Sequence, residues 1–263
     1  MKKVKLLVLA LIIAMSSLAF IGCGSDQASS TTADQKADEK VYLVGTDAAF
    51  PPFESTLPSG EIVGFDVDLM NAIAEAAGIK VEIKHLGWDP MLKGVENGNA
   101  DIGASGITIN DERKEFYGFT EPYFEATQLI MVPSDSTVAS LKDLEGQNIG
   151  VQSGTTGEIA VKKIFGDNYT GIKGYEDLPT AMADLLTGRT VAVVGDNAVL
   201  AELLKKSPDQ KLKLVSDDTF DKEYYGFIVK KGNTELLEKL NQGLKTIKEN
   251  GTYDEIYGKY FAE

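Results

Sequence analysis

The sequence has few of the residues on which many catalytic and metal sites depend. Its 263 residues include one cysteine, Cys23, and one histidine, His85. A disulfide framework and the common Cys/His zinc sites are therefore excluded, and a Ser-His-Asp triad could be built only around His85. We expect neither a metal nor a cofactor, and we interpret His85 as a packed or surface side chain rather than as a ligand or general base.

Basic residues are also scarce. The chain has 26 Lys and Arg against 40 Asp and Glu, which gives a formal net charge of −14. Because binding to phosphates requires clustered basic side chains, no nucleic-acid partner is expected. The composition, 43% hydrophobic and 25% charged, is ordinary for a soluble protein with a real core.

The N-terminus has the layout of a signal peptide. Three lysines precede 16 uncharged, mostly apolar residues from Leu6 to Ile21, a run shorter than the about 20 residues of a permanent membrane-spanning helix. The sequence Leu18-Ala19-Phe20-Ile21-Gly22-Cys23 resembles a bacterial lipoprotein lipobox, with Phe20 where leucine is usual. The resemblance implies that residues 1–22 are removed and that Cys23 is lipidated, with palmitate among its acyl chains. The alternative is a cysteine that merely follows a signal segment.

Loss of the leader makes the chain more acidic. Residues 1–22 contain three lysines and no acidic residue, so 23 basic and 40 acidic residues remain, a formal charge of −17. Residues 23–40 combine the expected anchor with a Ser-, Thr-, Ala-, Asp- and Gln-rich segment that lacks large apolar residues, which predicts a disordered spacer. Folded protein is expected from Val41.

From Val41 onward, short β-branched runs alternate with amphipathic stretches, which predicts an α/β protein with helices packed on mostly parallel sheets. Asp66 is expected to cap a helix that ends at Gly78, and Asp89-Pro90 to start another. The other expected helices are 155–165, 178–187, 198–205, 234–250 and 253–261, and the expected strands are 41–45, 81–84, 101–104, 148–151, 190–194 and one near residue 172.

This pattern occurs twice, which predicts two lobes of about 90–120 residues. The extended runs 127–132 and 224–230 are interpreted as crossovers, after which the C-terminal helices return to the first lobe. The predicted boundaries are therefore 41–131 plus 227–263 for lobe 1 and 132–226 for lobe 2.

Five blocks of the sequence resemble the polar amino-acid-binding proteins of bacterial ABC importers, solute-binding protein family 3. They are Gly45-Thr46-Asp47-Ala48-Ala49-Phe50-Pro51-Pro52-Phe53-Glu54, Gly64-Phe65-Asp66-Val67-Asp68-Leu69, Gly106-Ile107-Thr108-Ile109-Asn110-Asp111-Glu112-Arg113, Gln152-Ser153-Gly154-Thr155-Thr156-Gly157 and Asn250-Gly251-Thr252-Tyr253-Asp254-Glu255-Ile256-Tyr257. The resemblance implies a type II periplasmic-binding-protein fold. In this fold, two Rossmann-like lobes joined by two extended crossover strands close on an amino acid and then dock on a membrane permease.

A receptor for a free amino acid must neutralise a carboxylate, because a charge left unpaired in a cleft is costly. The resemblance places Arg113 as the carboxylate clamp, and a planar guanidinium suits two carboxylate oxygens. The alternative for Arg113 is a solvated pair on a helix surface. The loop 154–157, with Thr155 and Thr156, would offer N–H groups and hydroxyls to the same carboxylate, unless it is a plain strand-to-helix turn.

The ligand ammonium needs acceptors. Asp196 follows a strand and matches the family's acidic partner for this group, with a simple helix N-cap as the alternative. Ser105, Gly106 and Thr108 lie at the end of another strand, where open α/β sheets place their ligands, and would complete both charged shells.

The remaining wall is expected to set specificity. Phe50 and Trp88 match positions that sandwich the ligand side chain, and each aromatic face favours a cation by about 0.5–2 kcal/mol; core packing is their alternative role. Asp47 matches an acidic position near the distal end of the ligand that also occurs in glutamine binders. Gln152 is uncharged where glutamine-binding relatives place lysine. The combination indicates arginine, with lysine and histidine as alternatives.

We therefore expect a monomeric, extracytoplasmic lipoprotein on the outer face of the cell membrane, on the periplasmic side where an outer membrane exists. It would deliver a basic amino acid to ABC permease subunits without converting it. The alternatives are a binder of glutamine or another polar amino acid, an enzyme similar to cyclohexadienyl dehydratases with Glu54 or Glu125 as the acid, and a sensor ectodomain. The sensor is disfavoured because the sequence has no second apolar run of about 20 residues.

Overall fold

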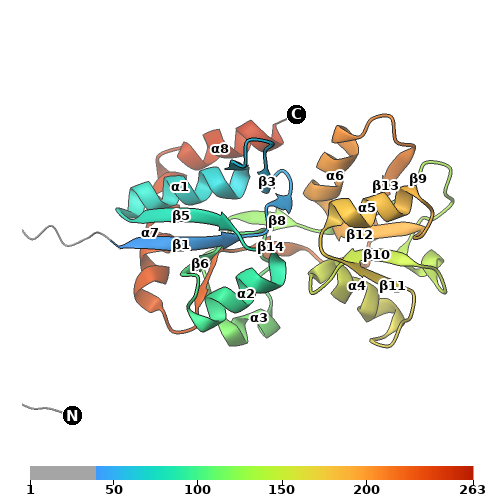
Figure 1. Ribbon diagram of the computed structural model, residues 1–263, viewed down its shortest axis with the longest axis horizontal. Coiled ribbons are helices and arrows are strands. Elements are labelled where there is room, and N and C mark those ends of the chain that lie inside the picture. The colour runs from blue at the N-terminus through green and yellow to red at the C-terminus, as the bar shows by residue number, and fades with distance from the viewer. Residues whose placement is uncertain (1–39, 263) are drawn as a thin grey trace, which may run out of the picture. The chain divides into compact units, whose positions relative to one another are not determined.

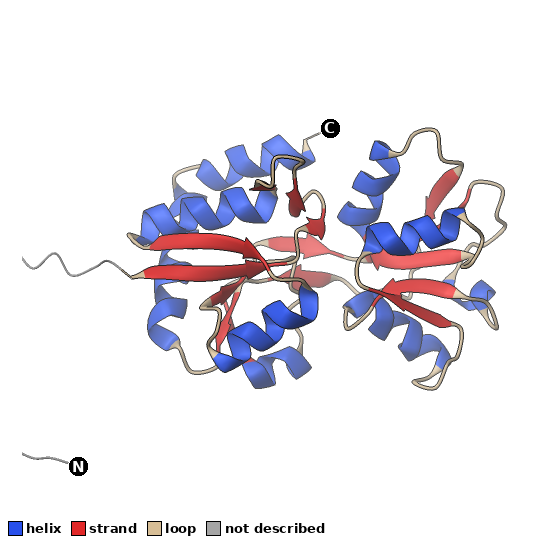
Figure 2. Cartoon of the chain, in the orientation of Figure 1, coloured by secondary structure: helices blue, strands red, loops and turns tan. Residues whose placement is uncertain are grey.

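The computed structural model describes residues 40–262, so the expected signal peptide, Cys23 and nearly all of the spacer lie outside the described residues. The described part forms two lobes, each a five-stranded sheet with helices on both faces (Figures 1 and 2). Within it, no helix combines the length and apolar character needed to cross a bilayer. The helices are α1 Phe65–Ala77, α2 Trp88–Asn97, α3 Asp111–Phe116, α4 Thr156–Phe165, α5 Leu178–Leu186, α6 Asn197–Lys206, α7 Thr234–Glu249 and α8 Thr252–Phe261, with a 3₁₀ turn at Leu141–Leu144.

The first lobe contains the sheet β5-β1-β6-β15-β7 and the second contains β11-β10-β12-β9-β13. The strands of the first are β1 Val41–Thr46, β5 Lys80–His85, β6 Ile102–Gly103, β7 Tyr117–Phe119 and β15 Ile228–Lys230. Those of the second are β9 Gln128–Pro133, β10 Ile149–Gln152, β11 Ile172–Tyr175, β12 Ala192–Asp196 and β13 Leu212–Val215. A small sheet adds β2 Ala49–Phe50, β3 Glu54–Thr56 and β4 Ile62–Val63.

In each sheet four strands run in one direction and a single strand runs against them, so the expectation of mostly parallel sheets is confirmed, with one antiparallel strand in each sheet. Strand β1 runs parallel to β5 and β6, and β10 runs parallel to β11 and β12. In contrast, β15 and β9 are antiparallel to both of their neighbours. These two strands enter their sheets from the crossovers, so they run away from the other lobe, whereas the βα strands run toward it.

The crossovers are β8 Phe124–Ala126 and β14 Glu223–Tyr225, which pair antiparallel and lie between the two sheets (Figure 1). The predicted crossover 127–132 falls mostly in β9, whose residues pair with β12 and β13. The proposed boundary after residue 131 therefore lies inside a strand of the second sheet. The other proposed boundary, after residue 226, lies between β14 and β15.

Glycines rather than acidic residues begin the first two helices. Helix α1 has Gly64 as its N-cap and α2 has Gly87, so Asp66 and Asp89 lie inside the first turns and the predicted caps are wrong. The predicted end of α1 is confirmed, because Gly78 adopts the left-handed conformation, φ 65°, that a helix C-cap favours.

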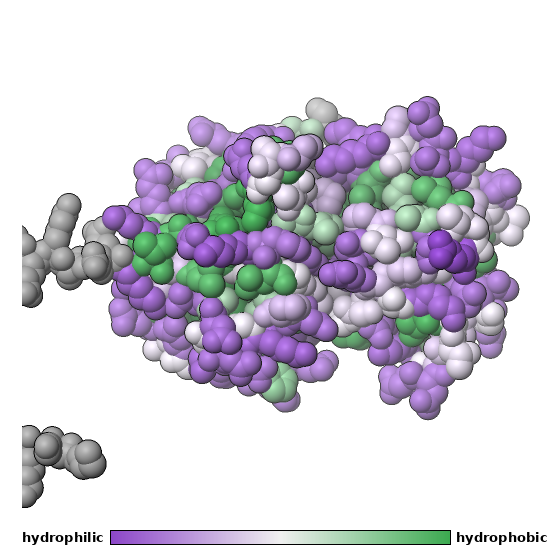
Figure 3. Space-filling model, in the orientation of Figure 1, coloured by the Kyte–Doolittle hydropathy of each residue, from purple (hydrophilic) through white to green (hydrophobic). Residues whose placement is uncertain are grey.

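On the face of the molecule in Figure 3, hydrophilic residues dominate, in keeping with the excess of acidic residues.

Candidate functional site

All eleven residues proposed from the sequence line one cavity, which is enclosed by both lobes. They are Asp47, Phe50, Trp88, Ser105, Gly106, Thr108, Arg113, Gln152, Thr155, Thr156 and Asp196. They lie at or just after the carboxyl ends of β1, β6, β10 and β12 or at the starts of nearby helices, where open α/β sheets form sites. The lining side chains of the two lobes lie close to one another. They leave a cavity of about 10 Å³, enough for about one water molecule.

Arg113 is a buried cation rather than a helix-surface residue. Its side chain is carried by α3, whose N-cap Asn110 accepts a hydrogen bond from the Arg113 N–H at 2.8 Å. The residue is 8% exposed, and its guanidinium donates to the carbonyl oxygens of Thr108 at 3.0 Å and Gly154 at 3.3 Å. Burial lowers the pKa of Arg113, whereas the carboxylates of Asp196 and Glu223 act in the opposite direction. The alternative considered for Arg113, a solvated pair on a helix surface, is therefore wrong.

The loop before α4 offers fewer donors than the sequence suggested. The hydroxyl of Thr155 donates to the carbonyl of Gln152 at 2.8 Å, and that of Thr156 donates to Glu223 at 2.7 Å. The N–H of Gly154 donates to Glu158. What remains for an anion is the set of N–H groups in the first turn of α4, which have no acceptor within the helix.

Asp196 is held by side chains from other elements. Although it occupies the N-cap position of α6, its side chain makes no cap hydrogen bond. Instead it accepts from the Tyr225 hydroxyl at 2.6 Å and from Gln128 Nε2 at 3.2 Å. Burial raises the pKa of Asp196 to about 7, and the nearby Glu223 carboxylate contributes. The N-cap role is therefore not the reason for an acid at this position.

Ser105 and Gly106 are hydrogen-bonded to two fully buried acidic side chains. The Ser105 hydroxyl donates to Glu54 at 2.6 Å, and the Gly106 N–H donates to Asp66 at 2.9 Å. Tyr123 also donates to Asp66, at 2.7 Å. Gly106 has a positive φ of 53°, and a Cβ there would lie 2.6 Å from the Phe50 ring, so only glycine fits.

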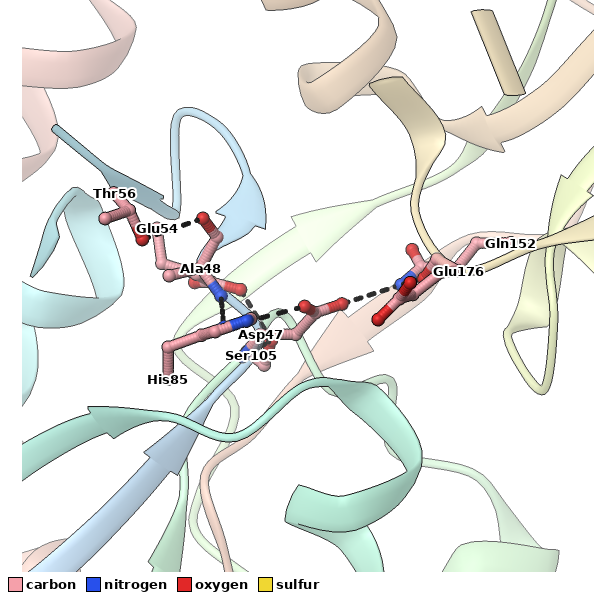
Figure 4. Close-up of polar contacts among 8 residues, drawn as sticks. All are labelled: Asp47, Ala48, Glu54, Thr56, His85, Ser105, Gln152 and Glu176. Atoms are coloured by element: carbon pink, nitrogen blue, oxygen red, sulfur yellow. Dashed lines mark hydrogen bonds and ion pairs between the residues drawn. The ribbon is translucent and has the colours of Figure 1, made fainter. Parts of the chain in front are cut away.

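Asp47 and Gln152 meet across the cavity from opposite lobes. Gln152 Nε2 donates to Asp47 at 2.8 Å and to the carbonyl of Glu176 at 2.9 Å (Figure 4). Burial raises the pKa of Asp47, and the Gln152 hydrogen bond opposes this shift. His85 lies 3.9 Å from Asp47, but its Nδ1 accepts the Ala48 N–H at 2.9 Å, so in this arrangement Nδ1 carries no proton.

The two aromatic residues serve both the cavity and the packing. Trp88 is 8% exposed, packs in the cluster that contains Met91 and Ile228, and donates to the Gly154 carbonyl of the other lobe at 3.2 Å. The Arg113 guanidinium lies over its ring at 5.1 Å from the centroid. Phe50 lies at the cavity and contacts Phe53. Trp88 therefore packs in the core and also lines the cavity.

Several residues of the site were not found from the sequence. Gln128, Glu223 and Tyr225 connect to Asp196 or to the threonines, and Asp66 lies behind Gly106. Gln128 was detectable as a polar residue within the apolar run 127–132. Glu125, a candidate acid, is exposed and paired with Lys222 at 2.7 Å, and neither it nor Glu54 lines the cavity.

The buried acids predict an unusual pH dependence of stability. Burial raises the pKa of Asp66 from 3.8 to about 7. A raised folded-state pKa contributes stability that is complete below the unfolded-state value and is lost as the pH rises through 7. We expect the free energy of unfolding of the ligand-free protein to fall by about 1 kcal/mol for this group between pH 6 and pH 8.

Urea denaturation at pH 6 and pH 8 measures this effect. Asp66→Asn should show a smaller difference between the two pH values than the wild type, because the amide does not titrate. A wild-type stability that rises between pH 6 and pH 8 would contradict the expectation.

Sequence comparison assigns the chain to a family. The family of bacterial extracellular solute-binding proteins, family 3, matches residues 42–263. The chain belongs to this family. This chain is 41% identical over 256 residues to a probable histidine-binding protein of Neisseria gonorrhoeae, and the match covers 97% of this chain and 95% of the relative.

Solved structures agree with this assignment. The arginine-, lysine-, histidine-binding protein ArtJ from Geobacillus stearothermophilus is similar with a TM-score of 0.82 and 48% identity, over 85% of this chain and 96% of ArtJ. An ancestral arginine-binding protein bound to glutamine is similar with a TM-score of 0.80 and 43% identity, over 85% and 98%. The expected type II periplasmic-binding-protein fold is confirmed for this solute-binding protein.

Proposed function

We propose that this solute-binding protein captures a basic amino acid, with arginine preferred over lysine and histidine, and delivers it to the permease of an ABC importer. The main support for this proposal is the charge of the residues that line the cavity. Of the eleven lining residues, the charged ones are Asp47, Asp196 and Arg113, a sum of −1 when all are ionised. A basic amino acid carries two cations and one carboxylate, so every charge has an opposite partner. Glutamine would leave one acid without a cation.

Each lining group then has a role. Arg113 and the first N–H groups of α4 bind the α-carboxylate, and Asp196 binds the α-ammonium. Asp47, which Gln152 contacts from the other lobe, faces the distal cation. Phe50 and Trp88 flank the ligand side chain, and Ser105, Gly106 and Thr108 complete the wall with Thr155 and Thr156.

Ligand entry requires the lobes to part, because about 10 Å³ cannot hold an amino acid. The crossovers β8 and β14 are the connections between the sheets about which such a motion would occur. In the closed complex, ligand groups would replace direct interlobe bonds such as Gln152 to Asp47 and Arg113 to the Gly154 carbonyl. The closed state gains contacts that the open state lacks, which is the differential affinity that shifts the population.

A ligand screen tests this function. Thermal unfolding of residues 24–263 with each of the twenty amino acids should show the largest stabilisation for arginine, since stabilisation grows with the logarithm of ligand excess. Asp47→Asn should weaken arginine binding about 10- to 100-fold and affect glutamine less. Asp254→Asn, an exposed substitution on α8 with the same charge change, is the control. A shift with glutamine that equals or exceeds the shift with arginine would contradict the proposed ligand.

The enzyme alternative has no support from the site. Glu54 is completely buried against Ser105, and Glu125 is exposed and paired with Lys222, so neither faces a substrate in the cavity. We therefore propose binding without chemical conversion. We propose separately that the protein is a monomer.

We also propose that the mature chain begins at Cys23 and is held by lipid at the outer face of the cell membrane. The lipobox resemblance supports this location, and the family is one of extracellular proteins. Mass spectrometry of the mature protein should find a lipid-modified Cys23 at its N-terminus. An unmodified cysteine would contradict the anchor and leave the ligand proposal unaffected.

A further inference from the structure

Glu223 belongs to the crossover strand β14 and is bonded to two residues that line the cavity, Thr108 and Thr156. It is opposite Ala126 of β8, in the antiparallel pair that joins the lobes. Glu223 and Tyr225 are two residues apart in a strand, so their side chains lie on the same face. Because the Tyr225 hydroxyl donates to Asp196, this face of the crossover is the one that meets the site.

One carboxylate connects both lobes at this point. Glu223 Oε2 accepts hydrogen bonds from the hydroxyls of Thr108, which comes from lobe 1, and Thr156, which comes from lobe 2, each at 2.7 Å. Glu223 Oε1 accepts from Gln128 Nε2 at 3.3 Å. The two threonine oxygens are 3.5 Å apart.

These bonds determine what the threonines offer to a ligand. A hydroxyl has one proton, and an ionised carboxylate can only accept, so the protons of both hydroxyls point at Glu223. Thr156 Oγ1 also accepts from Gln128 Nε2, at 3.2 Å. Both threonines line the cavity, and toward a ligand there their hydroxyls can act only as acceptors, because their protons are engaged by Glu223. An acceptor pair suits an ammonium group and repels a carboxylate.

The acceptor character extends to Asp196. Gln128 Nε2 lies within hydrogen-bond distance of Asp196, Thr156 and Glu223. Thr108, Gln128, Thr156 and Glu223 all line a neighbouring second cavity of about 280 Å³, and Thr108 and Thr156 line both cavities. These side chains therefore form a wall between the site and the second cavity.

We propose that Glu223 is a positioning residue that makes this wall selective for ligands with a free α-ammonium group. It acts through Thr108 and Thr156, whose hydroxyl protons it holds away from the cavity. The inference rests on the proposed function, because it assumes that an amino acid occupies the cavity.

The test compares L-arginine with 5-guanidinopentanoic acid, which is arginine without its α-amino group. Calorimetric titration of Glu223→Gln should show arginine affinity reduced about 10- to 100-fold, the range for a hydrogen bond to a charged group. Affinity for the analogue should change less than about 3-fold, because it has no ammonium to place. Glu125→Gln is the matched control, since Glu125 lies in the partner crossover strand, is exposed and bonds to Lys222 instead.

The outcomes separate the two proposals. If Glu223→Gln binds arginine as the wild type does, or loses the same factor for both compounds, Glu223 is not a selectivity residue and the inference is overturned while arginine binding stands. If the wild type and Glu125→Gln fail to bind arginine, the proposed function is overturned and the inference with it. Should Glu223→Gln not fold, Glu223→Asp keeps the charge and should show a smaller loss that is again confined to arginine.

Discussion

Replacing Arg113 by alanine should weaken arginine binding by about 2–5 kcal/mol, the range for removing one partner of a buried charge pair. The guanidinium is 8% exposed and reaches the Gly154 loop of the opposite lobe, so it lies where both lobes would meet the ligand carboxylate. Its loss leaves that carboxylate with the backbone N–H groups of α4 alone. Isothermal titration with arginine measures the change.

Arg189→Ala is the matched control for this prediction. Arg189 has the same chemistry, but its side chain is 70% exposed and pairs with Asp184 on the surface of the second lobe. Its removal should leave the dissociation constant unchanged. A near-wild-type affinity of Arg113→Ala would remove Arg113 from the site, whereas loss of binding in both variants would indicate a general effect on the fold.

Asp196→Asn should have the second large effect, a loss of arginine affinity of about 2–5 kcal/mol. The amide has the shape of the carboxylate and can still accept from Tyr225, so the change removes mainly the charge opposite the α-ammonium. Because burial raises the pKa of Asp196 to about 7, the wild-type affinity should fall as the pH drops below 7, since the acid must lose its proton to pair with the ammonium. The variant should lack this part of the pH dependence.

Asp177→Asn controls for the loss of a negative charge at a helix start in the same lobe. Asp177 caps α5 through a bond to the Thr180 N–H, and asparagine caps helices equally well. Unchanged arginine binding by Asp196→Asn, measured at pH 8, would show that Asp196 is not the ammonium partner. The pH profile adds a second criterion: wild-type affinity and the stability of the ligand-free protein should change in opposite directions between pH 6 and pH 8.

The local sequence was a good guide to the elements and to the residue types at the cavity. Turns at strand ends carried the polar residues, and the helix expected to end at Gly78 is α1, which buries Leu69, Met70 and Ile73 on one face. The same local signals misplaced the helix starts, because Asp66 and Asp89 have good capping chemistry while Gly64 and Gly87 adopt the backbone angles that begin the helices. Capping preference alone could not distinguish an acid at the cap from an acid in the first turn.

The family to which the protein belongs could be recognised from the sequence alone, through the repeated α/β pattern and the motif residues, and the excess of acidic residues was equally plain. The partners of those residues depend on the tertiary structure. The bond from Thr108 to Glu223 joins residues 115 positions apart, and that from Gln152 to Asp47 joins residues 105 apart. No local pattern encodes such pairs. Whether a hydroxyl donates or accepts at the cavity, and whether a carboxyl is ionised at neutral pH, depends on the partners and burial that folding brings together.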